Sequence, residues 1–427
     1  MNQEKIGAFI ASLRREKGYT QREVANRLAL SEKTISKWEC GKGLPDVVYM
    51  EPLCSLLGIS VNELLAGERI PILDLLKKVD ETRIELVTQI AFEQLKLRIF
   101  KLYGLDIDTV EMSDYGAGSM TYFISCGEQK YVVKYASENE MNHPEIEPEV
   151  CKHLLKEGIP VCDFVANRQG NIMSVDENGR RFHVQRFIEG KTYDYNHAPK
   201  WLMQESAQML AKIHNALRNM TELPVGIGAD FFRYRTPEAA LKGYHDTLQK
   251  AVVNGDVMIA DEIRSNMKIL EHFPTYEFDV NQFTCANTHG DFMITQLLCG
   301  ENSINGVIDW TTACVHPIVW EIIRSYVYAS PLCVNGEIDI SDFTDYVRTY
   351  LFYGTLNSYD LENMARMFFY FTAVCDFYGQ YYDSLTRNRD VYLQQAKLSS
   401  KLLRWFDTHV EELTKALQEV AIENERL

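Results

Sequence analysis

Two aspartates and one glutamine stand close together in residues 288–310, which read THGDFMITQLLCGENSINGVIDW. Residues 295–309 have the pattern of a hairpin, in which a polar turn that contains glycine joins two apolar strands. Folding this hairpin would bring Asp291, Gln296 and Asp309 together at one end. Two carboxylates and an amide oxygen suit Mg²⁺, a hard cation that prefers oxygen ligands. The same groups suit a general base that acts on a hydroxyl nucleophile.

A glycine-rich turn and a strand lysine lie upstream, in MSDYGAGSMTYFISCGEQKYVVKYA. The pattern predicts three strands joined by two turns. Gly116 and Gly118 would let the backbone approach a ligand closely, and Ser119 offers a hydroxyl or an N–H group to a phosphate. Lys134 stands among apolar residues, where a point cation suits the α- and β-phosphates of a nucleotide. Taken alone, an exposed strand lysine is the commoner explanation.

A helix and a further strand are predicted next. The helix, HPEIEPEVCKHLLKEGIPV, carries carboxylates that would hold Lys134 in place. We choose Glu149 for this role, although the spacing leaves Glu147 open. The strand in GRRFHVQRFIEG ends in a predicted hinge, where an adenine ring would lie against the backbone. The hinge residues assigned to nucleotide binding are Arg186, Phe187 and Ile188.

The order of these features resembles the aminoglycoside phosphotransferase family, whose members share a protein-kinase-like fold. The resemblance covers about residues 95–400 and rests on the glycine-rich turn, the strand lysine, RFIEG, LAKIHNAL, HGDFMITQ and GVIDW. It implies that ATP or GTP donates the phosphate and that Asp291 orients or deprotonates an acceptor hydroxyl. It also implies that His289 braces the loop and that Asp309 and Gln296 bind Mg²⁺. The family usually has Asn in place of Gln296, and Gln carries the same amide oxygen on a longer stem.

The first seventy residues alternate short helical patterns with turn signals. Thr20 and Glu23 form a capping-box pattern, and Ser31 caps the helix SEKTISKWE, whose Ile35 and Trp38 would point inward. The segment TQREVANRLALSEKTISKWECGKGLPD closely resembles the Cro/phage-repressor type of helix-turn-helix domain. In that family the helix that corresponds to Ser31–Glu39 enters the major groove of DNA. The resemblance implies base-edge contacts from Glu32, Lys33, Ser36 and Lys37, and phosphate contacts from Gln21 and Lys42. A solvated face, or a module used only for dimerisation, would also explain these residues.

Residues 69–92 lack Pro and Gly after Pro71 and are predicted to be a helical linker. Its leucines and isoleucine at Leu73, Leu76, Ile84 and Leu86 could form the seam of a homodimer. Packing on the following domain explains them at least as well. In residues 340–427, the aromatic residues at helical spacing are expected to be core. A few residues of this segment could instead line an acceptor pocket, namely Asp376, Tyr382 and Asp383.

Composition narrows the class of protein. The 427 residues are 46% hydrophobic and 24% charged, as in ordinary globular proteins. No apolar run reaches the length of a membrane span, and the first residues lack a signal-peptide core, so we expect a cytoplasmic protein. The ten scattered cysteines show neither zinc spacing nor a disulfide framework. Residues 1–70 hold 10 Lys and Arg against 9 Asp and Glu, so the net charge of −16 falls on the rest of the chain. That acidic body would repel nucleic acid and favour a cationic acceptor.

These observations predict a multidomain protein, with an all-α five-helix bundle followed by an α+β bilobal kinase-like domain. The predicted boundaries are 1–68 for the helix-turn-helix domain, 69–92 for the linker, 93–190 for the nucleotide-binding lobe and 191–427 for the mostly helical lobe. The predicted function combines binding of a double-stranded DNA operator with transfer of a γ-phosphate to the hydroxyl of a small molecule, such as an amine or a sugar. The alternative is a transcriptional regulator whose kinase-like domain senses a ligand or nucleotide with little or no turnover.

Overall fold

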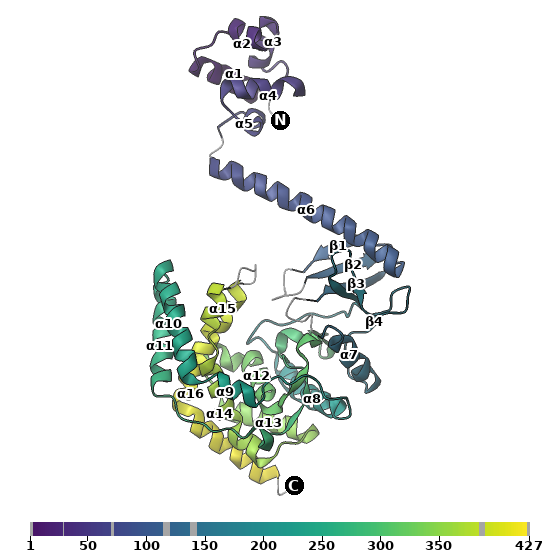
Figure 1. Ribbon diagram of the computed structural model, residues 1–427, viewed down its shortest axis with the longest axis vertical. Helices are drawn as coiled ribbons and strands as arrows, with labels where there is room; N and C mark the ends of the chain where they lie inside the picture. Colours follow the sequence, from purple (N-terminus) through teal and green to yellow (C-terminus); the bar gives the residue numbers. More distant parts are fainter. Residues whose placement is uncertain are drawn as a thin grey trace. The chain divides into compact units, whose positions relative to one another are not determined.

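The computed structural model describes residues 3–28, 30–69, 72–113, 120–136, 143–383 and 389–424, without the side chains of residues 47, 48, 72–87 and 424. The chain divides into two compact units, Met1–Leu95 and Lys96–Leu427 (Figure 1). Among the described residues, no helix has both the length and the apolar character that a membrane crossing needs. All ten cysteines lie in the described ranges and are free of disulfides.

The first unit begins with five short helices around a small apolar core, as predicted (Figure 1). Ile35 and Trp38 are buried in this core. The predicted capping box is confirmed, because the Thr20 side chain accepts from the Glu23 N–H while the Glu23 carboxylate accepts from the Thr20 N–H at 2.7 Å. The helices are α1 (Gln3–Glu16), α2 (Gln21–Arg27), α3 (Glu32–Glu39), α4 (Val47–Leu57) and α5 (Val61–Ala66).

A single long helix, α6 (Ile72–Tyr103), occupies the predicted linker and continues past its expected end at residue 92. It stops at Gly104, whose φ of 75° is typical of the left-handed residue that ends a helix. Ile99 is fully buried within the second unit, which explains why the helix continues. The side chains proposed as a dimer seam, Leu73, Leu76, Ile84 and Leu86, lie outside the description.

An antiparallel sheet forms the first lobe of the second unit. Its strand order is β1-β2-β3-β6-β4, and β5 also pairs with β6. The register places Lys134 of β3 opposite His183 of β6, so both side chains lie on one face of the sheet. The strands are β1 (Thr109–Met112), β2 (Thr121–Cys126), β3 (Gln129–Tyr135), β4 (Phe164–Val165), β5 (Ser174–Val175) and β6 (Arg181–Arg186), and the lobe's helix is α7 (Ile146–Lys156).

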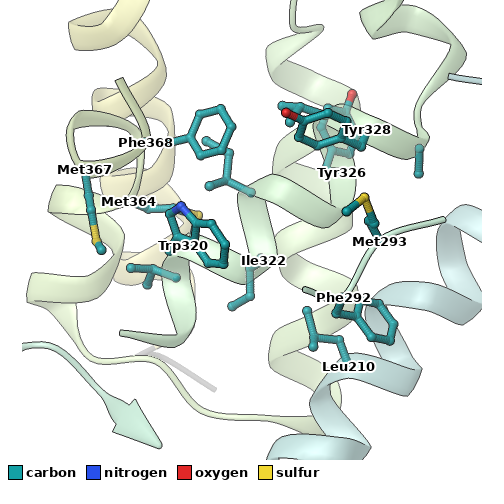
Figure 2. Close-up of a cluster of buried hydrophobic side chains, with 14 of the residues drawn as sticks. Leu210, Phe292, Met293, Trp320, Ile322, Tyr326, Tyr328, Met364, Met367 and Phe368 are labelled. Carbon is teal, nitrogen blue, oxygen red and sulfur yellow. The ribbon is translucent and has the colours of Figure 1, made fainter. Parts of the chain in front are cut away.

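Helices make up most of the second lobe, whose core is rich in aromatic side chains. Figure 2 shows Trp320, Ile322 and Phe368 within this core, and all three are buried. Phe343 and Phe369 are fully buried, which confirms that the aromatic stripes of residues 340–427 are mainly core. The helices are α8 (Lys200–Leu217), α9 (Ala229–Tyr234), α10 (Pro237–Asn254), α11 (Val257–Glu271), α12 (Ile318–Ala329), α13 (Ile340–Tyr353), α14 (Ser358–Val374), α15 (Phe377–Asp383) and α16 (Arg389–Asn424).

Two short strand pairs carry the segment with the clustered carboxylates. The predicted hairpin is present, since β8 (Leu297–Cys299) pairs with β9 (Ile304–Val307). A second pair, β7 (Cys285–Thr288) with β10 (Cys314–Pro317), flanks the same segment. The loop after β7 and the loop before β10 are therefore held next to each other. Short 3₁₀ turns complete the lobe, as η1 (Val280–Gln282), η2 (Ile294–Gln296), η3 (Trp310–Thr312) and η4 (Pro331–Asn335).

Candidate active site

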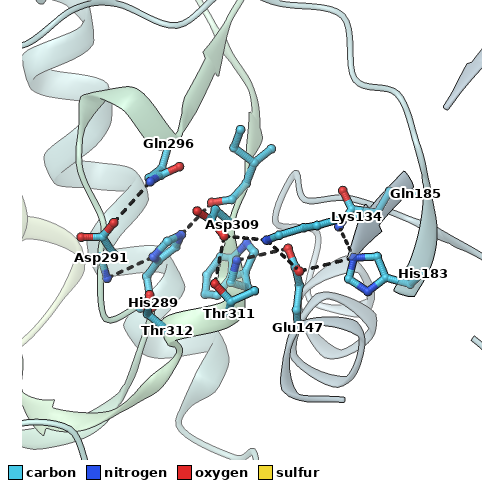
Figure 3. Close-up of polar contacts among 12 residues, drawn as sticks. Lys134, Glu147, His183, Gln185, His289, Asp291, Gln296, Asp309, Thr311 and Thr312 are labelled. Atoms are coloured by element: carbon cyan, nitrogen blue, oxygen red, sulfur yellow. Dashed lines mark hydrogen bonds and ion pairs between the residues drawn. The ribbon is translucent and has the colours of Figure 1, made fainter. Parts of the chain in front are cut away.

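Lys134 is the centre of an ion-pair cluster in which Lys134 and Glu147 are buried and the Asp309 side chain is 43% exposed (Figure 3). Its Nζ lies 2.6 Å from Oδ1 of Asp309 and 3.1 Å from Oε2 of Glu147. The lysine side chain is only 9% exposed. Because an unpaired buried charge is costly, the two carboxylates explain how this cation is tolerated there. The cluster joins β3, α7 and the segment that follows β9.

Glu147, and not the Glu149 chosen from the sequence, is the helix carboxylate that contacts Lys134, and this corrects the prediction. Glu147 is 1% exposed, whereas Glu149 lies exposed on another face of α7. The sequence held a signal that decides between them, because Glu147 belongs to the apolar stripe of α7 at helical spacing. The other buried residues at that spacing are Val150, Cys151 and Leu154.

Asp309 is held in an unusual backbone conformation. Its φ of 65° and ψ of 62° lie in the left-handed region, which residues other than glycine rarely adopt and which recurs at functional sites. Its Oδ1 accepts from the Thr311 hydroxyl at 3.0 Å as well as from Lys134. Burial opposes ionisation, but the ammonium of Lys134 prevails and the pKa of Asp309 lies below its usual value. The site therefore holds Asp309 as an anion.

Asp291 lies in the loop after β7, and its carboxylate has two side-chain partners, Arg324 and Gln296, of which Figure 3 labels Gln296. Nη2 of Arg324 lies 2.6 Å from its Oδ1, and Nε2 of Gln296 donates to its Oδ2 at 3.3 Å. Burial raises the pKa of Asp291 above its usual value, and the Arg324 guanidinium opposes that shift. The two aspartates thus sit in electrostatically different surroundings. Gln296 thus contacts Asp291 five positions earlier in the chain, and its backbone carbonyl accepts from the Ile308 N–H at 3.0 Å, so the hairpin brings Gln296 beside the residue that precedes Asp309.

His289 and Gly290 tie this loop to the other side of the site. Nδ1 of His289 accepts from the Asp291 N–H at 3.2 Å, so its Nε2 donates to the carbonyl of Ile308 at 2.9 Å. Gly290 has a φ of 80°, and a Cβ there would lie 2.0 Å from the carbonyl oxygen of Thr312. Only glycine permits that approach. The loop bearing Asp291 and the segment bearing Asp309 therefore pack directly against each other.

The buried Glu321 of α12 supports the same loop through hydrogen bonds. It is fully buried, and its Oε1 accepts from the Phe292 N–H at 3.0 Å. Its Oε2 accepts from the Thr288 hydroxyl and lies 3.4 Å from Nε2 of His214. Burial works against ionisation, but the contact with His214 and the nearby imidazoles lower the pKa of Glu321 to about 2. Glu321 is therefore an ionised support for the loop.

The donor set fits a divalent cation that arrives with a nucleotide. Asp309 and Gln296 carry oxygen atoms of the kind that Mg²⁺ accepts. In the described ranges, no three His, Cys, Asp or Glu side chains gather as a metal cage. Mg²⁺ in phosphate-transferring sites typically uses one or two protein oxygens, with phosphates and waters as its other ligands. The residues present match that arrangement.

The structure describes some of the other residues that were predicted to contact the nucleotide. Gly116, Gly118 and Ser119 lie outside the described residues. Beyond them, the Arg186 side chain is exposed and pairs with Asp163 at 3.3 Å. Its neighbours after β6 are half-buried: the N–H of Phe187 donates to the carbonyl of Lys130 at 3.2 Å, and Ile188 packs on Gly306 of β9. The hinge therefore joins the sheet to the hairpin.

One polar residue near Lys134, His183, was not predicted from the sequence. His183 is buried, with Nε2 3.5 Å from Glu147 and 3.1 Å from the amide nitrogen of Gln185. Burial, aided by Lys134, lowers the pKa of His183 to about 3, so the ring is neutral. The signal was the alternation in FHVQR, which puts His183 and Gln185 on one face of a buried strand.

The residues considered for an acceptor pocket are engaged in internal contacts. Asp376 accepts from the Thr247 hydroxyl at 2.5 Å. The hydroxyl of Tyr382 donates to Asp256 at 2.7 Å, and Asp383 pairs with Lys250. Together these contacts fasten α15 to the α10–α11 pair.

A charged outer face marks α3 in the first unit. Glu32, Lys33 and Lys37 are exposed and Ser36 is half-buried, while the other side of the helix fills the core. Lys42 is exposed just beyond the helix. Gln21, expected to contact phosphate, donates from its side chain to Glu39 at 2.8 Å.

Comparison with known proteins agrees with both halves of this description. Residues 7–70 match the model of a helix-turn-helix domain. Over 61 residues the chain is 36% identical to the HTH-type transcriptional activator BcrR of Enterococcus faecalis, a match that covers 14% of this chain and 30% of BcrR. It is 42% identical over 60 residues to the uncharacterized HTH-type transcriptional regulator y4dJ of Sinorhizobium fredii, covering 14% of this chain and 78% of that protein. The chain thus spans less than a third of BcrR.

The second unit has its own relatives. Residues 114–352 match the model of the phosphotransferase enzyme family. A microcompartment-associated aminopropanol kinase has a similar fold, with a TM-score of 0.50 and 13% identity over 75% of this chain and 98% of the kinase. A spectinomycin phosphotransferase aligns with a TM-score of 0.48 and 15% identity, over 78% of this chain and 98% of that enzyme. The chain therefore belongs to the phosphotransferase enzyme family and carries a helix-turn-helix domain in its first unit.

Proposed function

We propose that the second unit transfers the γ-phosphate of Mg·ATP, or of Mg·GTP, to a hydroxyl of a small molecule. The observation that carries this proposal is the cluster in which Lys134 bridges Glu147 and Asp309, next to the loop that bears Asp291. A paired lysine, an ionised aspartate and a separate carboxylate are the parts that phosphoryl transfer requires. All of them lie in one site within a single compact unit.

Each residue has a distinct part in the proposed reaction. Lys134, held by Glu147, binds α- and β-phosphate oxygens. Asp309 and Gln296 would hold Mg²⁺, which neutralises charge on the β- and γ-phosphates when bound. Asp291 lies apart from Lys134 and faces the acceptor, where it orients the hydroxyl and takes up its proton. Holding nucleotide and acceptor in line supplies much of the rate enhancement.

The acceptor is proposed as a small hydroxyl compound, with amines and sugars as the first classes to test. The net charge of −17 carried by residues 71–427 favours a cationic compound by long-range attraction. The kinase and phosphotransferase relatives act, by name, on an aminopropanol and on spectinomycin. These names define the compounds to try first.

Calorimetry on the full chain tests the proposal. AMP-PNP should bind with Mg²⁺ and lose most of its affinity when EDTA removes the metal. A screen of amino alcohols, aminoglycosides and sugars should then find an acceptor that raises ADP release from Mg·ATP. If no nucleotide binds at millimolar Mg²⁺, the protein is neither this phosphotransferase nor a nucleotide sensor.

The second candidate function is a transcriptional regulator whose kinase-like unit senses its ligand. The exposed, charged face of α3 favours it, because that face belongs to a helix-turn-helix domain. Nucleotide binding without turnover on any acceptor, together with a ligand-dependent change in DNA affinity, would support the sensor over the enzyme. Both functions are compatible with one chain.

A further inference from the structure

Arg324 is a buried arginine on α12 that the proposed reaction has not used. The residue is 7% exposed. Its guanidinium carbon lies 5.0 Å from the ring centre of Trp320 and 5.3 Å from that of Tyr328. These aromatic residues stand four positions before and after it, so all three share one face of α12. Stacking on two rings fixes the plane in which the guanidinium can donate hydrogen bonds.

The ion pairing of this arginine is directed at a single carboxylate. Nη2 lies 2.6 Å from Oδ1 of Asp291. Nη1 is buried and has no hydrogen-bond partner in the described part of the chain. A buried arginine that served stability alone would be expected to satisfy its donors, because an unpaired buried donor is costly. Replacing a buried ion pair by apolar side chains is often neutral for stability. The unpaired Nη1 therefore points to a role of Arg324 beyond stability.

The other anchor of Asp291 is Gln296, whose Nε2 donates to Oδ2 at 3.3 Å. Gln296 is also a proposed metal ligand, so its amide has a second role besides the contact with Asp291. Arg324 has no second role of this kind among the described residues. Glu321, one turn earlier on α12, holds the backbone of Phe292 directly after Asp291. One helix thus fixes both the loop backbone and the carboxylate.

We propose that Arg324 is the positioning residue that sets the orientation of the Asp291 carboxylate toward the acceptor hydroxyl. This inference rests on the proposed phosphotransferase function. The arginine acts through Asp291 and does not itself take part in bond making. A lysine in its place would keep the charge but lose the planar stacking on Trp320 and Tyr328.

Two variants and a control test this role in the full chain. Arg324→Met removes the cation with little loss of volume, and Arg324→Lys restores only the charge. The control is Arg366→Met on α14, which removes an arginine that pairs with Glu411 at 2.6 Å in the same unit. Each protein is crystallised with Mg²⁺ and AMP-PNP. Each is then assayed for ADP release from Mg·ATP, with the acceptor found for the wild type and with water alone.

In Arg324→Met we expect the Asp291 carboxylate to leave its orientation and kcat to fall on the order of 100-fold, as for a misplaced reacting group. The KM for ATP should stay within about threefold, because Asp291 does not face the nucleotide. Arg324→Lys should recover part of kcat, and Arg366→Met should match the wild type. An unchanged Asp291 orientation in Arg324→Met overturns the inference even if the protein proves to have no turnover. Wild-type protein that binds AMP-PNP but transfers no phosphate would instead count against the proposed reaction.

Discussion

Asp291 and Asp309 have opposite electrostatic surroundings, and this difference agrees with the separate roles proposed for them. Burial raises the pKa of Asp291, whereas Lys134 overcomes burial and lowers the pKa of Asp309. Pairs of carboxylates whose surroundings separate their pKa values commonly divide the work of a site. Asp309 is suited to remain an anion beside a cation. Asp291 is suited to exchange a proton with an acceptor.

Exchanging each aspartate for asparagine should separate binding from chemistry. Asp291→Asn is expected to bind Mg·AMP-PNP almost as the wild type does, while phosphate transfer falls by roughly 10²–10⁴-fold, the usual contribution of a general base. Asp309→Asn should weaken Mg²⁺-dependent nucleotide binding itself. Calorimetry and a coupled ADP assay on the same samples measure both effects. Equal losses of binding and turnover in Asp291→Asn would mean that the two roles are wrongly assigned.

A pair of glutamates on α7 offers a matched test of the lysine cluster. Glu147→Gln removes one of the two carboxylates around the buried Lys134 ammonium, so kcat should fall on the order of 10-fold or more as the cation loses its position. Glu149→Gln makes the same chemical change on the exposed face and should leave kcat unchanged. Steady-state kinetics on both variants decide the matter. Similar behaviour of the two variants would show that the contact with Glu147 has no role in turnover.

The sequence predicted the grouping of the site better than its details. The hairpin pattern was enough to bring Gln296 to Ile308, beside Asp309, since strand pairing fixes which residues meet. The same reasoning selected Glu149 over Glu147, because the apolar stripe of α7 was not used to set the phase of the helix. The contact of Arg324 with Asp291 was not predicted, because it depends on how α12 packs against a loop far away in sequence, which no local pattern shows.

At the scale of elements, α12 is the main support of the proposed catalytic loop. All twelve of its residues are buried, including Glu321 and Arg324. A helix buried on every side carries charges only where partners neutralise them. Glu321 meets this condition through Phe292, Thr288 and His214. The helix therefore couples packing of the lobe to the geometry of the loop.

The ionised state of Glu321 should make stability depend on acidity. Its pKa in the folded protein is about 2, against about 4.3 for an unfolded glutamate. A lowered folded pKa adds stability that is fully present above pH 4.3 and is lost as pH falls towards 2, here on the order of 3 kcal/mol. Glu321→Gln should therefore lose stability at neutral pH and show a flatter decline in acid. Urea unfolding between pH 7 and pH 3 measures this.

The control for that experiment is Glu362→Gln on α14, whose glutamate is 46% exposed and pairs with Arg366 at 3.6 Å. An exposed pair of this kind contributes little, so its acid dependence should match the wild type. If Glu321→Gln also follows the wild-type curve, the ionised brace does not contribute to stability.

At the scale of the whole molecule, the fold class followed from the order of motifs. Each of three motifs indicated a known architecture: the helix-turn-helix, the strand lysine and the hairpin with its carboxylates. The sheet of the kinase-like unit contains the strands that this order predicted. The linker did not follow as closely. The α6 helix continues to Tyr103 because Ile99 is buried in the second unit, and a boundary placed by composition alone cannot see that packing.

Charge is divided unevenly along the molecule, and this shapes how it should bind DNA. The first 70 residues are nearly neutral, while the rest carries the net negative charge. Phosphate attraction supplies most non-specific binding, and this chain has few spare cations. Binding should therefore depend on base-edge contacts from the exposed face of α3. We expect weak binding to random DNA and selective binding to an operator with paired half-sites.

Substitutions on and beside α3 should separate specificity from general affinity. Lys33→Ala or Ser36→Ala should each cost about 1–3 kcal/mol on the selected operator and relax its sequence preference. Lys42→Ala should weaken all sequences alike and lower the slope of log K against log salt by about 1. Lys17→Ala serves as the control, because it also removes one lysine charge, but from a side chain that lies beside Gly58 at the end of α4. The operator is first selected from genomic fragments with the full chain at low salt, and affinities are then measured by fluorescence anisotropy. If no sequence is enriched, the charged face of α3 does not read DNA, and the first unit must serve another purpose, such as self-association.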